Sequence, residues 1–102
     1  MRAMRIHAYS DTFDEPMVLD DIPLPEPGPG ELLVKVKAIG VNPVDLSIRR
    51  GLPNYVSHLE LPHLLGSEIS GEVEALGEGV ANFAKGDKIF GYCPTRDAYS
   101  EY

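Results

Sequence analysis

Short alternations of apolar and polar residues recur along the chain and predict a mainly β fold. A weak alternation over residues 2–9 predicts a first strand with one solvated face, and residues 17–22 predict a second strand that ends at Pro23. The clearest strand spans residues 31–41, whose two ends are apolar on both faces and are therefore expected to be buried. One face of this strand is predicted to carry Leu32, Val34, Val36 and Ala38.

The second half of the chain continues with short strands. Residues 68–75 alternate acidic or hydroxyl residues with small or apolar ones, which predicts a half-buried strand with an acidic outer face. Gly71 within this strand indicates a bulge or a close backbone approach. Residues 88–92 predict another short strand, and a last strand is expected to begin at Ala98. The connection over residues 52–65 is predicted to be irregular because prolines interrupt it.

One short helix is predicted directly after the longest strand. Asn42 is a favoured N-cap residue, since its side-chain oxygen can accept a free backbone N–H, and Pro43 then takes the first helical position. Asp45 stands at the spacing of a capping box, and Gly51 can end the helix in the left-handed conformation. Capping explains Asn42 and Asp45 without any chemistry, so this interpretation stays open for both residues.

Composition narrows the class of protein. The 102 residues suffice for one domain with a modest core, and a hydrophobic share of 43% is ordinary for a soluble protein. The net charge of −7 argues against nucleic acid and anionic membranes as partners. The sequence shows no secretory signal and no apolar run that could span a bilayer. Its single cysteine, Cys93, fits the reducing cytoplasm and is expected to be a small buried hydrophobic residue.

Three motifs that suggest ligand binding fail on their context. Gly28-Pro29-Gly30 precedes a strand, whereas a phosphate-binding loop follows one. Gly77-Glu78-Gly79 follows a strand but lacks the third glycine and the helix of a dinucleotide fingerprint. His58 and His63 do not have the spacing of zinc ligands, and no cysteine cluster accompanies them. These motifs therefore predict neither a phosphate site nor a metal site.

Several segments, taken in order, resemble the opening part of the medium-chain dehydrogenase/reductases. They span nearly the whole chain, so the resemblance is more specific than any single motif. The segments are Leu24-Pro25-Glu26-Pro27-Gly28-Pro29-Gly30-Glu31 with Val34-Lys35-Val36, Gly40-Val41-Asn42-Pro43-Val44-Asp45, Gly66-Ser67-Glu68 with Gly71 and Gly77, Gly79-Val80 through Phe83 to Gly86-Asp87, and Tyr99-Ser100-Glu101-Tyr102. The resemblance implies a GroES-like, partly open β-barrel over residues 1–102, which is the N-terminal catalytic domain in that family.

Metal chemistry then selects a branch of this family. Zinc-dependent members carry a cysteine where Asn42 stands and a histidine where Ser67 stands. An amide and a hydroxyl are poor zinc ligands, and the one carboxylate of Glu68 does not hold the ion alone. The chain therefore resembles the zinc-free quinone oxidoreductases, which implies hydride transfer from NADPH to a quinone, an enone or a carbonyl compound.

The same resemblance implies where the site lies. The turn at the start of the helix is expected against the nicotinamide end of NADPH, with Asn42 as the catalytic residue that meets developing negative charge. Tyrosines that the family often carries near this turn are absent, and Tyr55 is the nearest substitute for binding substrate. The implied cofactor-binding residues are Asn42, Pro43, Val44, Asp45 and Ser47.

The dinucleotide-binding domain of the family would lie beyond residue 102. Hydride transfer needs both reactants held together, so we expect residues 1–102 alone to be inactive. The barrel is expected to be incomplete, with an exposed edge through which the chain associates, for instance as a homodimer. The alternative function is a stand-alone GroES-like module for binding or assembly, without catalysis.

Overall fold

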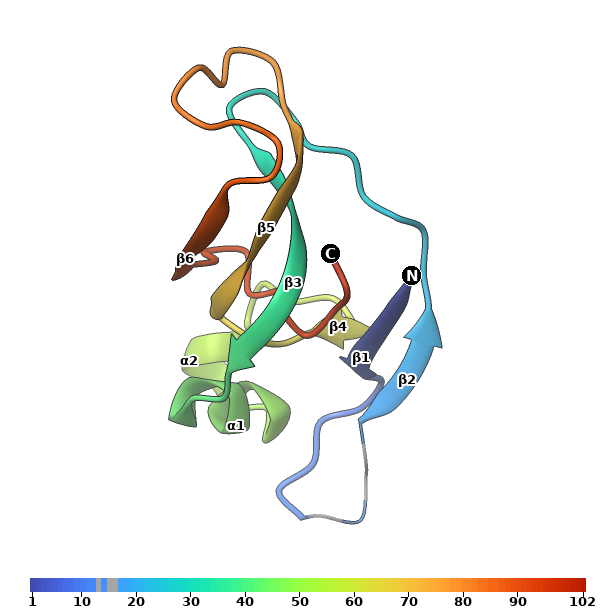
Figure 1. Cartoon of the computed structure of the whole chain (residues 1–102). Coiled ribbons are helices and arrows are strands. Elements are labelled where there is room, and N and C mark those ends of the chain that lie inside the picture. The colour runs from blue at the N-terminus through green and yellow to red at the C-terminus, as the bar shows by residue number, and fades with distance from the viewer. Residues whose placement is uncertain (13, 15–16) are drawn as a thin grey trace.

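Two antiparallel three-stranded sheets and two short helices form the part of the chain that this computed structural model describes, residues 1–12, 14 and 17–102 (Figure 1). The first sheet has the strand order β2-β1-β4, and the second has the order β3-β5-β6. The elements are β1 (Arg2–Ile6), β2 (Val18–Asp21), β3 (Leu32–Gly40), α1 (Pro43–Arg49), α2 (Pro53–Val56), β4 (His63–Leu64), β5 (Glu68–Leu76) and β6 (Lys88–Tyr92).

The fold is mainly β, as the sequence predicts, with the predicted helix at α1 and a second short helix at α2, and the two sheets are not closed into a barrel. Two segments differ from their predictions. The connection over residues 52–65, predicted to be irregular, holds both α2 and the short strand β4. The segment from Ala98 onward, predicted to begin a strand, forms no named strand, and its β-type pairing is an isolated bridge between Ala3 and Ser100. Within the described residues no helix is long and apolar enough to cross a membrane.

The longest strand, β3, does not keep the simple alternation that its sequence suggests. Its pairing with β5 shifts register between Leu33 and Val34 and again beyond Val36, so the strand turns its faces along its length. Leu33 and Val34 are both buried as a result. The end of the strand is exposed: Ile39 and the following Val41 keep 40% and 71% of their surface. The prediction that this end is buried is therefore wrong for the described chain.

Gly71 of β5 lies tightly against the backbone of β3. It pairs with Val36, and a Cβ added at this position would collide with the backbone oxygen of Lys35. Only glycine leaves room for this approach. The close backbone approach that the sequence predicts is confirmed.

The main core lies between α1 and the β1 sheet. Ile6 of β1, Ile48 of α1 and Leu65 after β4 are almost fully buried and form one cluster. A helix as short as α1 is unstable alone, so this apolar contact is what keeps it folded. The partly buried side chains around the cluster are Met17, Val44, Val56, Leu59 and Tyr99.

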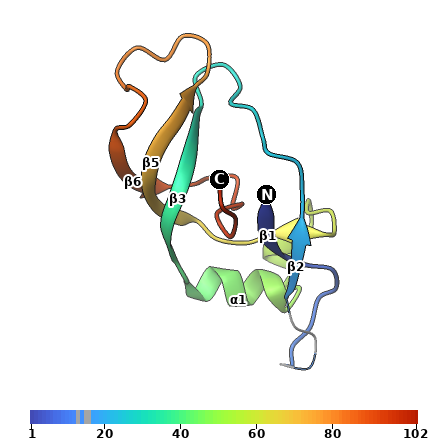
Figure 2. The same ribbon diagram turned by 45° about the vertical axis from the view of Figure 1, so that its right-hand side comes forward.

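The last residues of the chain connect the two sheets. The N–H of Met4 in β1 donates to the carbonyl of Tyr99 at 2.8 Å, and the N–H of Val36 in β3 donates to the carbonyl of Glu101 at 2.9 Å. Arg2 adds an ion pair with the Glu101 carboxylate at 2.7 Å. Figures 1 and 2 both place this C-terminal segment in the space between β1 and β3. It therefore fixes how the sheets lie relative to each other.

Candidate functional site

Asn42 lies where β3 has ended and α1 begins. Its backbone is extended, with φ −125° and ψ 158°, and it takes the N-cap position that the sequence predicts, followed by Pro43 in the first turn. Its N–H donates to Oδ2 of Asp45 at 2.8 Å, which is the half of a capping box that Asp45 supplies. The backbone of Asn42 is therefore fixed by the helix that it starts.

The side chain of Asn42 is held by Glu68, the first residue of β5. Nδ2 of Asn42 donates to Oε2 of Glu68 at 2.9 Å. The two residues meet because Gly40 pairs with Glu68 across the β3–β5 ladder. A side chain at Gly40 would collide with the Glu68 carboxylate, so glycine here makes the contact possible. The result is an exposed polar pair at one end of the sheet.

Asp45 is the buried carboxylate of the site, with 2% of its surface exposed. Its Oδ1 accepts the N–H of Gly66 at 3.0 Å, and its Oδ2 accepts both the N–H of Asn42 and the hydroxyl of Tyr99. A buried charge is stable only when donors surround it in this way. Asp45 therefore joins the start of α1, the turn before β5 and the C-terminal segment.

Tyr99 is enclosed by the same group. Its hydroxyl donates to Asp45 at 3.0 Å, and its ring lies against Gly66, where a Cβ would strike it. Burial, together with the neighbouring carboxylate, raises the pKa of the Tyr99 phenol far above its ordinary value. Tyr99 is therefore a neutral hydrogen-bond donor over the whole physiological pH range.

The residues at the zinc position do not fit a zinc ion. Ser67 is buried, and its hydroxyl has no hydrogen-bond partner among the residues that the structure describes. Asn42 offers only an amide, and its Nδ2 is already bonded to the carboxylate of Glu68. Zinc requires several thiolate, imidazole or carboxylate ligands around one point. Among the described residues no three histidine, cysteine or acidic side chains are grouped closely enough to hold a metal ion.

The other predicted site residues lie around α1 with different accessibility. Pro43 is exposed, whereas Ser47 is half-buried and donates its hydroxyl to the Pro43 carbonyl at 3.2 Å. Val44 packs against the core cluster. Tyr55 lies on α2, which contacts α1, and 42% of its surface is exposed. The structure thus brings Asn42, Pro43 and Ser47 to an accessible surface, while it places Val44 and Asp45 toward the interior.

A shallow hollow of about 480 Å³ lies beside the Asn42–Glu68 pair. Glu68 and Gly40 form part of its wall, and Phe90 and Tyr92 of β6 form another part. These two aromatic side chains are 88% and 64% exposed, which is unusual for residues of this size. The hollow therefore combines a polar corner with open aromatic faces.

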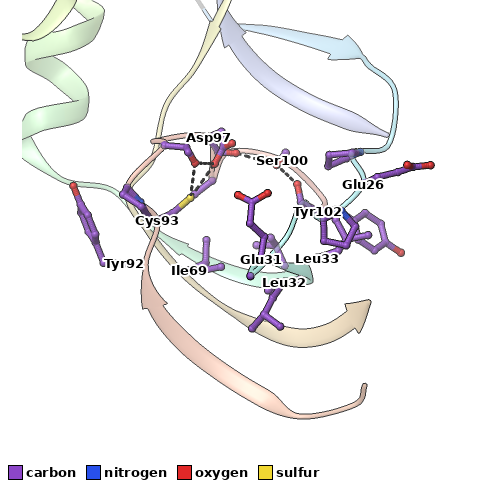
Figure 3. A pocket seen from close by; sticks show the side chains of 18 residues that line it. Glu26, Glu31, Leu32, Leu33, Ile69, Tyr92, Cys93, Asp97, Ser100 and Tyr102 are labelled. Atoms are coloured by element: carbon purple, nitrogen blue, oxygen red, sulfur yellow. Dashed lines mark hydrogen bonds between the residues drawn. The ribbon is translucent and has the colours of Figure 1, made fainter. Parts of the chain in front are cut away.

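A second hollow, of about 510 Å³, lies along the first part of β3 (Figure 3), and Asn42 lines neither hollow. Glu31, Cys93 and Tyr102 are among its lining residues. Cys93 is half-buried and donates its Sγ hydrogen to Asp97 at 2.9 Å. Cys93 is therefore not the fully buried hydrophobic residue that the sequence predicts.

Sequence reasoning misses the roles of Glu68 and Tyr99. The alternation of β5 assigns Glu68 to the solvated acidic face together with Glu72 and Glu74, and only the pairing with Gly40 distinguishes it. Tyr99 is 54 positions away from Asp45, so no local pattern connects them. The glycines at positions 40 and 66 are the sequence signals that could have pointed to both contacts.

An open two-sheet β domain with a polar site at the strand ends matches a known class of domain. The chain belongs to the alcohol dehydrogenase GroES-like domain family, whose model matches residues 28–101. It is 38% identical to the quinone oxidoreductase of Rattus norvegicus over 105 aligned positions. This alignment covers 100% of the chain but only 30% of that relative. The resemblance to quinone oxidoreductases among the medium-chain dehydrogenase/reductases is thereby confirmed.

Solved structures agree with this assignment. The human synaptic vesicle membrane protein VAT-1 homolog-like protein matches with a TM-score of 0.89 and 35% identity, over 99% of this chain and 31% of that chain. The quinone oxidoreductase of Escherichia coli, solved in complex with NADPH, matches with a TM-score of 0.87 and 30% identity, over 99% of this chain and 29% of that one. The GroES-like fold predicted from the sequence is confirmed.

Proposed function

We propose that residues 1–102 are the substrate-side domain of a zinc-independent, NADPH-dependent oxidoreductase that transfers hydride to a quinone, an enone or a carbonyl compound. The observation that carries this proposal is the Asn42–Glu68 pair, which stands beside an aromatic hollow at the position of the family's zinc ligands. Similarity to quinone oxidoreductases, one of them solved with NADPH, supports it. The dinucleotide-binding domain then belongs to sequence beyond residue 102.

In this proposal the chain's residues bind and orient the acceptor. NADPH, when bound, supplies the hydride. Phe90 and Tyr92 offer flat apolar faces on which a planar quinone ring can stack. Asn42 has two amide hydrogens, of which Glu68 takes one, so the other is left for the oxygen that gains negative charge. A hydrogen bond of this kind replaces the metal ion of the zinc-dependent branch.

The cofactor side of the proposal concerns the exposed surface of α1. Of the cofactor-binding residues that the resemblance implies, Asn42, Pro43 and Ser47 reach this surface, and we assign them to the nicotinamide end of NADPH. Val44 and Asp45 support the same surface from beneath, Val44 by packing and Asp45 by its hydrogen bonds. Tyr55, exposed on α2, is assigned to substrate binding.

NADPH oxidation by the full polypeptide that the gene encodes tests the proposal. With 9,10-phenanthrenequinone as acceptor, we expect consumption of NADPH that depends on the quinone and does not change after treatment with a zinc chelator. Residues 1–102 alone are expected to show no turnover. The proposal is overturned if the full polypeptide oxidises no NADPH with quinones or enones, or if its activity follows its zinc content.

The same preparation distinguishes the alternative of a stand-alone binding or assembly module. That alternative predicts that residues 1–102 fold reversibly, form oligomers of defined size and do not bind NADPH.

We further assign the protein to the cytoplasm and place association between two copies at the open edge of β6, where Phe90 is exposed. Substitution of Phe90 by serine is expected to weaken such association in gel filtration.

A further inference from the structure

We propose that Glu68 is a positioning residue that fixes the amide of Asn42, and that Asp45 braces the same turn from its buried side. The part of this inference that concerns turnover rests on the proposed function. The part that concerns the geometry of Asn42 does not.

The inference rests on a ring of hydrogen bonds that begins and ends at Asn42. The N–H of Asn42 donates to Asp45, and Asp45 also accepts the N–H of Gly66 at 3.0 Å. Gly66 stands two residues before Glu68, which accepts Nδ2 of Asn42 at 2.9 Å. The ring therefore starts and ends at Asn42, with one carboxylate on its backbone and another on its side chain.

The chemistry of the two partners gives this contact a direction. An ionised carboxylate only accepts hydrogen bonds, so Glu68 must face the NH₂ end of the Asn42 amide and not its oxygen. An amide at an exposed site without such a partner can turn about its last bond and interchange its donor and acceptor ends. Glu68, which lines the hollow, thus keeps the NH₂ end of the Asn42 amide turned toward itself.

The sequence around Glu68 makes room for this contact specifically. A Cβ at Gly40 would meet Oε2 of Glu68 and would also lie 3.3 Å from Nδ2 of Asn42. Glu72 is exposed on the same strand, but its register partners are Lys35 on β3 and Lys88 on β6. Glu72 therefore offers a matched control, with the same side chain on the same strand.

Side-chain amide resonances of Asn42 test the geometry directly, in the full polypeptide labelled with isotopic nitrogen at asparagine. The variant N42D identifies the Asn42 signals, and Asn54 and Asn82 of this chain serve as exposed references. We expect the two Asn42 protons to be well separated in chemical shift and to exchange slowly with water. E68A is expected to make them resemble the references, E68Q to preserve part of the separation, and E72A to leave them unchanged.

Two results would overturn the positioning role: Asn42 signals that E68A does not change, or signals that E72A changes as much. Thermal unfolding of each variant verifies that it is folded. If E68A does not fold, the comparison of E68Q with wild type tests the positioning role. In NADPH oxidation with 9,10-phenanthrenequinone, E68A is expected to lower kcat about tenfold with little change in KM, and E68Q to restore most of it. If the wild-type protein shows no turnover, the proposed function fails while the resonances still decide the role of Glu68.

Discussion

Tyr99 donates its hydroxyl hydrogen to Asp45 at 3.0 Å, although 54 positions separate the two residues in the chain. The contact ties the C-terminal segment, which joins the two sheets, to the first turn of α1. Asp45 is almost fully buried, and this donor together with two backbone N–H groups satisfies its carboxylate oxygens. The position of the candidate site is thus coupled to the arrangement of the sheets.

Removal of the Tyr99 hydroxyl is expected to destabilise the protein. Y99F keeps the ring against Gly66 but leaves the buried carboxylate with one donor fewer, which costs about 1–3 kcal/mol. Urea unfolding monitored by circular dichroism measures this difference. Y55F is the matched control, because Tyr55 is exposed, and it is expected to change stability by less than about 0.5 kcal/mol. Equal stability of Y99F and wild type would contradict the role of this hydrogen bond.

The same contact predicts a loss of stability in alkaline solution. The pKa of Tyr99 is raised above its ordinary value of 10.0, first by burial and then by its hydrogen bond to Asp45. Below pH 10 the phenol is protonated in both the folded and the unfolded chain, so its full contribution is present. Above that pH the unfolded chain releases the proton more readily, and stability falls. In unfolding curves across this range, Y99F is expected to decline less steeply than wild type.

The local structure around the candidate site could be predicted from the sequence, but the partners of its side chains could not. Asn42, Pro43 and Asp45 lie in the first turn as their capping chemistry predicts, because capping depends only on neighbours in the chain. The other donors to Asp45 come from Gly66 and Tyr99, which only the tertiary fold brings near. The burial of Asp45 therefore cannot be predicted from the local sequence, which indicates a solvent-exposed helix start.

For the longest strand, β3, the sequence predicts the extent of the strand but not which of its residues are buried. Its extent is predicted almost to the residue, since apolar residues alternate with lysines along its middle and turn residues bound it. The exposure of its C-terminal end could not be predicted, because two register shifts against β5 turn Ile39 toward the surface. A bulge changes which residues face inward without changing the composition that a sequence displays.

Neutralisation of Asp45 is expected to weaken the fold as well as the turn. In D45N the amide oxygen can still accept hydrogen bonds from Asn42 and Tyr99. The new NH₂ group then faces the N–H of Gly66, so two donors lie together without an acceptor. We expect a loss of about 1–3 kcal/mol in the free energy of unfolding.

Asp87 supplies the control for this substitution. Its carboxylate accepts the N–H of Ala84 at 2.9 Å in an exposed turn, where water can replace the contact. D87N is therefore expected to lose less than about 1 kcal/mol in the same urea titration. A larger loss for D87N than for D45N would show that burial of Asp45 has little energetic importance.

The turn before β5 is expected to tolerate only glycine at position 66. Gly66 has a φ of +97°, and a Cβ there would strike both the Tyr99 ring and the Cβ of Ala98. G66A is expected to destabilise the protein by about 2 kcal/mol or more, because it adds backbone strain to this collision. Gly91 in β6 has no positive φ and open space around its Cβ position. G91A should therefore unfold at nearly the same urea concentration as wild type, and an equal shift for both variants would refute the steric argument.

Acid is expected to destabilise the protein through His63. Nε2 of this residue is buried without a hydrogen-bond partner among the described residues, and burial lowers the pKa of the ring below its ordinary value of 6.5. Asp97 favours the charged ring and Arg96 opposes it, but burial is the largest effect. Well above pH 6.5 the ring is uncharged in both the folded and the unfolded chain.

Below pH 6.5 the unfolded chain binds a proton at position 63 that the folded chain binds less readily, so stability falls as the pH falls. H63F removes the titrating group and keeps an aromatic ring of similar shape. Between about pH 7.5 and about pH 5.5 its free energy of unfolding is expected to fall less than that of wild type. H58Q, at an exposed position, is expected to follow the wild-type curve. An H63F protein that loses stability as steeply as wild type would show that another group causes the acid sensitivity.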